Sequence, residues 1–282
     1  MPVTRTALTD AYMRLAEVLP GLGVTELDPS GEVPRDGGWV AAGALAAGGA
    51  ELDAFLAWDD AQVLRDYGQR ARPDVVASFG LHRYAWPACL LITVPWFLHR
   101  RVPRYPAAHV AYDRSAVGLP LGRMAVRPAG FACLPGDPAA ALPGARVVAD
   151  EEALRAEVRA AVAEHLEPVL AGFGPRMRRR GRALWGMATD EVVEGLWYVA
   201  HLLGEQERAR HELELLLPGA ATKPYVGDAA FRELTGPDGR PLHTRDRASC
   251  CMFYTVRPED TCTTCPRTCD ADRVEKLLAT AS

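Results

Sequence analysis

The sequence lacks the motifs of several common enzyme classes. It has no internal repeat, no glycine fingerprint for a dinucleotide, no P-loop, no Gly-x-Ser-x-Gly nucleophile motif and no His-x-x-x-His pair. Its formal net charge is −4, so it also lacks the basic excess that is typical of nucleic-acid-binding domains. Nothing therefore indicates a nucleotide-dependent enzyme, a serine hydrolase or a nucleic-acid partner.

Long hydrophobic runs are scarce as well. The N-terminus has no uninterrupted apolar stretch followed by a small-residue cleavage site, and no eighteen uncharged apolar residues follow one another. The nearest stretch, residues 85–98, contains Pro87 and Pro95 and is flanked by Arg83 and Arg100. We therefore expect a buried core helix there and no transmembrane segment. A cytoplasmic protein is indicated, and loose association with a membrane stays open.

Cysteine is abundant in one place. Five of the seven cysteines fall within twenty positions near the C-terminus: Cys250, Cys251, Cys262, Cys265 and Cys269. Disulfides are typical of oxidising compartments and of small secreted domains with thin cores. This chain has 282 residues, 49% of them hydrophobic, and has ample apolar material for a core. We therefore expect reduced thiolates that bind a metal.

The spacing of these cysteines does not by itself identify the metal. The Cys262-Thr263-Thr264-Cys265 turn suits zinc and iron–sulfur centres equally, because it brings two thiolates to one metal. Cys250 and Cys251 have no spacer, and neighbouring side chains of an extended strand point to opposite faces. Either the backbone bends there, or the two sulfurs reach different irons of a binuclear cluster. From geometry alone, a zinc site and an iron–sulfur site are about equally compatible with this spacing.

The residues around the cysteines resemble a known family. Arg247-Ala248-Ser249-Cys250-Cys251-Met252-Phe253-Tyr254, followed by Cys262-Thr263-Thr264-Cys265-Pro266, is similar to the C-terminus of FhuF-type ferric-siderophore reductases. Weaker similarities occur in residues 81–86 and 183–186. The resemblance implies a [2Fe–2S] cluster held by Cys250, Cys251, Cys262 and Cys265, whereas Cys269 lies outside the four-cysteine pattern.

The resemblance also implies a function. Siderophores hold Fe(III) through hard oxygen ligands, and we expect hydroxamates here. Addition of a single electron gives Fe(II), which such ligands hold far less well. The expected reaction is one-electron transfer from the cluster to siderophore-bound Fe(III), with release of Fe(II) in the cytoplasm. Without a flavin or nicotinamide fingerprint, electrons would come from a separate donor such as a ferredoxin or a reductase. The alternative is a non-redox siderophore-binding or assembly protein related to siderophore synthetases, with a structural zinc at the cysteines.

A few further residues are candidates for this site, and none is expected to act as a catalytic acid or base. Arg247 would place positive charge near the sulfurs, and Tyr254 would shield the cluster from water, although each is equally compatible with an ordinary strand position. His82 and Trp185 would line a siderophore pocket, although a core position is as plausible. The basic residues of segment 176–182, placed at the start of a helix, suggest a docking site for an acidic donor or an anionic siderophore or, more simply, a solvated turn.

The periodicity of apolar residues predicts an α+β protein, predominantly helical, with a small antiparallel sheet and a C-terminal cysteine-rich hairpin or loop. We expect an N-terminal helical region (1–102), a strand-containing and helical-bundle region (103–240) and an iron–sulfur-binding C-terminal segment (241–282). Helices are expected at 8–19, 52–67, 74–99 (kinked or split at its prolines), from 150 onward, 184–203, 205–217 and 270–279. Strands are expected at 109–112, 124–127 and 252–256, with a hairpin about the turn at 235–239.

Overall fold

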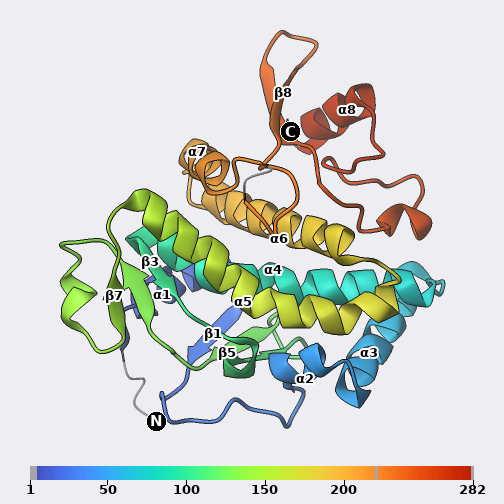
Figure 1. The fold of residues 1–282 in the computed structure, drawn as a ribbon. Coiled ribbons are helices and arrows are strands. Elements are labelled where there is room, and N and C mark those ends of the chain that lie inside the picture. Colours follow the sequence, from blue (N-terminus) through green and yellow to red (C-terminus); the bar gives the residue numbers. More distant parts are fainter. Residues whose placement is uncertain (1–4, 220–221, 281–282) are drawn as a thin grey trace.

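Three long helices form the frame of the molecule. The computed structural model describes residues 5–219 and 222–280, and in it α4 (Pro73–His99) packs against both α5 (Glu151–Met177) and α6 (Gly181–Leu202). The C-terminal segment lies on one side of this helical layer, and most of the sheet structure lies on the other (Figure 1). The frame therefore separates the cysteine-rich segment from the sheets.

Helix α4 is central because nearly every side of it is apolar. Its residues from Val75 to Phe97 are mostly buried, and α1 (Thr9–Val18), α3 (Ala50–Tyr67), α5 and α6 cover it. In the described part of the chain it is the one helix long and apolar enough to cross a membrane, but 83% of its most apolar window is buried inside the protein. The sequence prediction of a buried core helix is confirmed.

The predicted split of α4 at its prolines is wrong, because the helix runs through Pro87 and Pro95. A proline lacks the N–H that would bind the carbonyl four residues earlier. For Pro95 that carbonyl belongs to Leu91, and the Tyr12 hydroxyl of α1 donates to it at 2.8 Å. Packing from all sides and this replacement hydrogen bond keep the helix continuous.

The other predicted helices are confirmed: each predicted first or last residue lies within three residues of the observed one. Asp150 caps α5 by accepting a hydrogen bond from the Ala153 N–H at 2.8 Å, and the buried stripe of α5 starts at Leu154. The remaining elements are α2 (Ala42–Ala47), α7 (Gln206–Leu216), α8 (Asp270–Thr280), and the short 3-10 helices η1 (Ala107–His109), η2 (Pro138–Ala141) and η3 (Phe253–Thr255).

Two small mixed sheets and one hairpin complete the α+β fold, which confirms the predicted class. The first sheet has the order β1-β5-β4-β2, and its β4–β5 pair is the predicted antiparallel one. The second has the order β3-β6-β7. Strand β1 lies in a segment for which we expected neither a helix nor a strand, and it pairs parallel to β5. The bounds are β1 (Gly23–Glu26), β2 (Val40–Ala41), β3 (Arg101–Pro103), β4 (Val110–Asp113), β5 (Arg123–Val126), β6 (Phe131–Cys133), β7 (Ala145–Val147), and the hairpin β8 (Phe231–Thr235)–β9 (Pro241–Arg245).

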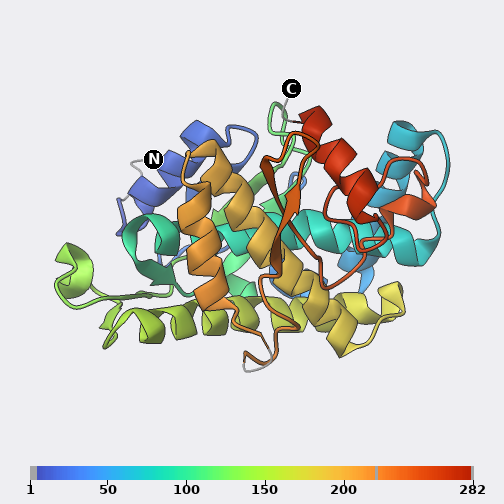
Figure 2. The ribbon, with the colours of Figure 1, turned by 90° about the horizontal axis from the view of Figure 1, so that it is seen from above.

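The C-terminal segment docks through apolar residues that the sequence assigned to a strand. Residues 252–256 instead form the 3-10 helix η3, preceded by Met252 at a φ of 68°. The Phe253 ring packs against Tyr67 and Phe79 at centroid distances of 5.6 and 6.2 Å, and Val256 is buried in the same cluster. Seen from above, the segment crosses α6 and reaches α3 (Figure 2). The prediction of a strand is wrong because these residues pack onto two helices.

A buried histidine joins α4 and α5 within the core. The Nδ1–H of His165 donates to the Tyr105 carbonyl at 2.7 Å, and its Nε2 accepts from the Tyr84 hydroxyl at 2.7 Å. Acceptance at Nε2 requires the neutral ring, whereas the Nδ1–H bond forms in either protonation state. Burial lowers the pKa of His165 from 6.5 to about 4.

Acidification should therefore weaken the fold through His165. Between pH 6.5 and about 4 the unfolded chain binds a proton that the folded chain does not, so stability falls as the pH falls. From pH 7 to pH 4.5 we expect this residue to contribute a loss of about 2 to 3 kcal/mol. Urea unfolding at the two pH values should show a smaller loss in His165→Gln than in the wild type. The control His201→Gln alters an exposed residue and should behave like the wild type. An unchanged pH dependence in His165→Gln would contradict this account.

Candidate metal centre

The four cysteines of the sequence pattern lie in two loops of the C-terminal segment. Cys250 and Cys251 follow β9, and Cys262 and Cys265 precede α8. All seven thiols of the chain are free; Cys265 is buried, Cys250 and Cys251 are half-buried, and Cys262 is exposed. Cys89 and Cys133 are buried in the main core. The centre thus has a covered side and an open side.

The backbone bends immediately after the first cysteine pair. Met252 adopts the left-handed conformation, and its N–H donates to the Cys250 Sγ at 3.4 Å. The Cys250 carbonyl accepts from Arg179 at 2.7 Å, and the Cys251 carbonyl accepts from the Ser78 hydroxyl at 3.1 Å. The pair is therefore held from two directions, by the α5–α6 loop and by α4.

The second pair forms a tight turn. The Cys265 N–H donates to the Cys262 carbonyl at 3.1 Å, and the Arg273 guanidinium donates to the Cys265 carbonyl at 3.2 Å. Within the turn, the Thr264 hydroxyl donates to Glu194 of α6 at 2.8 Å. Helix α8 and helix α6 therefore fix this turn at the same time.

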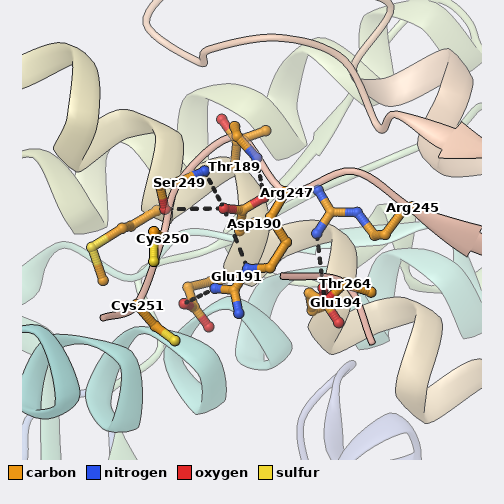
Figure 3. Close-up of polar contacts among 12 residues, drawn as sticks. Thr189, Asp190, Glu191, Glu194, Arg245, Arg247, Ser249, Cys250, Cys251 and Thr264 are labelled. Atoms are coloured by element: carbon orange, nitrogen blue, oxygen red, sulfur yellow. Dashed lines mark hydrogen bonds and ion pairs between the residues drawn. The ribbon is translucent and has the colours of Figure 1, made fainter. Parts of the chain in front are cut away.

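A single buried carboxylate on α6 fixes the loop before the first cysteine pair (Figure 3). Asp190 is fully buried and accepts from the Arg245 guanidinium at 2.8 Å. It also accepts from the Ala248 N–H at 2.9 Å, and from the Ser249 N–H and hydroxyl at 2.9 and 3.0 Å. These donors span the residues that lead directly into Cys250, so Asp190 sets where the first pair begins.

Arg247 supplies a buried positive charge beside the thiols. Its side chain is 7% exposed, and its Nε and Nη2 lie 3.6 and 3.9 Å from Asp190 and Glu191 without forming a hydrogen bond in the described part of the chain. Burial opposes its charge, but Glu191 and Asp190 outweigh this effect and raise the pKa of Arg247, which stays protonated. Its N–H groups are thus available to a further acceptor.

The thiols themselves respond to burial and to one another. Burial raises the pKa of Cys251 and of Cys262, and Arg247 acts on both in the opposite direction. Cys250 and Cys265 raise the pKa of Cys251, and Cys251 and Cys265 raise that of Cys262, so Cys251 lies within electrostatic reach of the other three thiols. Binding of a metal as thiolate would therefore release protons.

The residues present fit a [2Fe–2S] cluster. Four thiols with a buried guanidinium beside them suit a centre of net negative charge. Within residues 5–219 and 222–280, no three His, Cys, Asp or Glu side chains converge as closely as one metal ion requires. A binuclear cluster distributes its four sulfur ligands over two irons.

The other candidate residues lie in three different places. His82 binds Glu191 through Nδ1 at 2.6 Å and, with Arg247 and Cys262, lines one cavity. Tyr254 is half-buried beneath the Arg267 guanidinium, 4.1 Å from its ring centroid. Trp185 packs against Tyr225 at a centroid distance of 5.5 Å and lines another cavity. The structure thus brings His82 and Arg247 together near Cys262 and leaves Tyr254 and Trp185 apart.

Two basic residues of segment 176–182, Arg176 and Arg179, bind residues of distant segments. Arg176 binds Asp53 and the Gly48 carbonyl, and Arg178 caps the C-terminal end of α5. The expectation that the whole run lies at the start of a helix is therefore wrong, and at a helix end cations interact favourably with the dipole. Arg179, which binds the Cys250 carbonyl, has a role that sequence reasoning missed.

Sequence reasoning also missed the carboxylates of α6. Asp190, Glu191 and Glu194 interrupt an otherwise largely apolar helix, and all three bind arginines of the segment that leads to the cysteines. Acidic residues on the buried face of a helix need partners. That requirement is the signal by which these residues could have been found.

Replacing Asp190 by asparagine should loosen the cysteine-bearing loop. Asn keeps the shape but removes the charge opposite Arg245, and it turns an N–H₂ group toward donors. We expect a loss of about 3 to 5 kcal/mol in unfolding free energy and a lower iron and sulfide content after reconstitution. The control Glu259→Gln breaks a surface pair with Arg257 and should cost less than about 1 kcal/mol. Equal stability and equal iron content in Asp190→Asn would contradict this role.

Comparison with known proteins agrees with this geometry. No curated protein matches the chain significantly. A family model described as FhuF 2Fe-2S C-terminal domain matches residues 247–267, which contain Arg247 and all four cysteines of the pattern. The resemblance found in the sequence is confirmed by this match. Residues 247–267 are therefore similar to the FhuF 2Fe-2S C-terminal domain, and the cysteine cluster in this segment supports a [2Fe–2S] cofactor.

Proposed function

We propose that this protein is a cytoplasmic ferric-siderophore reductase, with Cys250, Cys251, Cys262 and Cys265 as the ligands of its cluster. The observation that carries the proposal is the family match at residues 247–267, because members of that family are siderophore reductases. When bound, a [2Fe–2S] cluster supplies one electron at a time. The substrate would be siderophore-bound Fe(III), of the hydroxamate type, and a ferredoxin or a separate reductase would supply the electron.

The chemistry requires access more than it requires acid–base catalysis. Fe(III) gains one electron and becomes Fe(II), a softer ion that oxygen donors hold less tightly, so the metal leaves its chelator. The exposed Cys262 lies on the open side of the centre, where a chelate can approach. Cys265, Cys250 and Cys251 lie on the covered side of the centre, where the surrounding protein shields them from water.

The surrounding residues position and tune the centre. Asp190 and Arg179 fix the backbone of the first pair, and Glu194 fixes the turn of the second pair. Arg247 places a permanent positive charge near the sulfurs. A positive charge favours the reduced, more negative state of a cluster and raises its potential.

Cys262→Ser should abolish both the cluster and the reduction of ferric chelate. Serine oxygen is a harder donor than thiolate sulfur and does not replace it well on an iron–sulfur centre. Iron and acid-labile sulfide analysis, with a visible spectrum before and after dithionite, measures the first effect. The matched control is Cys269→Ser, which removes an exposed thiol outside the pattern and should keep both properties. Full iron content and activity in Cys262→Ser, or a colourless wild type that retains zinc after anaerobic reconstitution, would refute the proposal.

Arg247→Gln should shift the midpoint potential to a more negative value. The variant removes the buried charge next to Cys251 and Cys262, whereas Arg247→Lys retains a charge and should shift the potential less. A redox titration followed by electron paramagnetic resonance measures both. The control Arg257→Gln alters a half-exposed arginine of the same segment. If the potential of Arg247→Gln equals that of the wild type, Arg247 does not tune the centre.

A further inference from the structure

The basic loop between α5 and α6 borders a cavity of about 620 Å³. Its wall combines apolar side chains with guanidinium groups, chiefly Leu170, Leu184 and Trp185 with Arg178, Arg179 and Arg180. Among the described residues, it shares no wall residue with the larger cavity of about 1150 Å³ that borders Cys262. The metal centre can therefore be approached from two separate surfaces.

We propose that the basic surface at the start of α6 docks the electron donor, and that this donor is an acidic one-electron carrier protein, such as a plant-type [2Fe–2S] ferredoxin. The inference rests on the proposed reductase function and adds the surface at which the donor binds. One electron passes from the reduced carrier to the oxidised cluster, and no bond forms or breaks. The unbalanced charge of the surface, its apolar centre and its contact with the cysteine loop support the proposal.

Three arginines of this surface carry charge that the described chain does not balance. Arg178, Arg180 and Arg182 are exposed, and within residues 5–219 and 222–280 their side chains form no ion pair or hydrogen bond. Among the described residues of the cavity wall, Glu167 supplies the one carboxylate against three guanidinium groups. The whole chain has a formal net charge of −4, so this excess of positive charge is local. Such a surface steers a partner of opposite charge toward it.

Local stability does not account for these charges. Arg180 occupies the N-cap position of α6, and Arg182 lies in the first turn of this helix. Cations at the start of a helix oppose its dipole, and the first turn of α6 contains no acidic residue that would offset them. Carboxylates of a docked partner would supply the missing negative charge.

Apolar side chains form the centre of the surface. Leu170 and Leu184 are 3% and 6% exposed, and the half-buried Trp185 packs against Tyr225. An apolar centre within a polar rim is typical of protein–protein interfaces, and tryptophan and arginine often dominate their binding energy. The arginines are exposed rather than enclosed, which suits a protein surface better than a pocket for a free anion. Complexes between electron-transfer proteins need only small interfaces, below about 1200 Å² in total.

The surface lies one side chain away from the first cysteine pair. Arg179 lines the cavity, and its guanidinium donates to the Cys250 carbonyl at 2.7 Å. Helix α6 also approaches this loop closely, because a Cβ at Gly186 would lie 3.3 Å from the Ala248 carbonyl oxygen. The exposed Cys262 borders the other cavity. A donor on the basic surface would therefore leave the open side of the centre free for a ferric chelate.

Isothermal titration calorimetry of the cluster-loaded protein with a plant-type [2Fe–2S] ferredoxin, both oxidised, tests docking apart from electron transfer. We expect Arg180→Glu/Arg182→Glu to bind at least about tenfold more weakly than the wild type at an ionic strength of about 20 mM. The difference should shrink at about 300 mM, because salt screens exposed charges. Glutamate at the start of a helix favours the dipole, so the substitutions should spare the fold.

The matched control is Arg14→Glu/Arg35→Glu. It makes the same change of net charge at two exposed arginines, one on α1 and one in the loop between β1 and β2, and should bind the ferredoxin like the wild type. Equal affinity of Arg180→Glu/Arg182→Glu and the wild type, or no binding by the wild type, would overturn the proposal. Loss of binding only to inorganic phosphate or to anionic lipid vesicles in this variant would also overturn it, because the arginines would then serve another anion.

The failure of this surface and the failure of the reductase function are distinguishable. If the ferredoxin binds through the arginines and reduces the cluster, but a ferric chelate is never reduced, the docking surface stands and the reductase function fails. If dithionite-reduced protein reduces the chelate, but Arg180→Glu/Arg182→Glu binds the ferredoxin like the wild type, the reductase function stands and the docking surface is overturned.

Discussion

The buried Asp190 carboxylate is the constraint on which the cysteine-bearing segment depends. The segment from 246 to 269 has little regular structure of its own, apart from one turn of 3-10 helix. A carboxylate with four donors in a dry environment is costly to disturb, because each lost bond leaves a buried group unpaired. The rigid helix α6 therefore fixes the position of this loop, which has too little regular structure to hold one conformation by itself.

The same helices serve the metal centre and the cavity beside it. Glu191 of α6 lies close to Arg247 near the thiols and binds His82 of α4 in the cavity wall. One turn further along α6, Glu194 binds the Thr264 hydroxyl of the cysteine turn. Carboxylates of α6 thus fix the cysteine-bearing loops and lie beside Arg247 of the cavity wall. The position of the cysteine turns relative to the cavity is therefore set by the frame.

The parts of this structure that the sequence predicted are those with a local signal. Long helices have apolar periodicity and capping residues, and the cysteine pattern together with its flanking residues resembles a family whose cofactor it implies. Strand β1 was missed because it is four residues long and its partner β5 lies far along the chain. The continuity of α4 through Pro95 depends on the Tyr12 hydroxyl of another helix, and η3 depends on Tyr67 and Phe79. The cavity, too, exists only once distant elements have packed together.

In the most direct test, the reduced, cluster-loaded protein is freed of excess dithionite and then mixed with a ferric trihydroxamate under anaerobic conditions. The decay of the reduced-cluster signal in electron paramagnetic resonance and the appearance of Fe(II) are followed together. The account predicts that both occur at the same rate and that one Fe(II) forms per cluster oxidised, because the cluster carries single electrons. A reduced signal that persists in the presence of the chelate, or Fe(II) that forms without its decay, would contradict it.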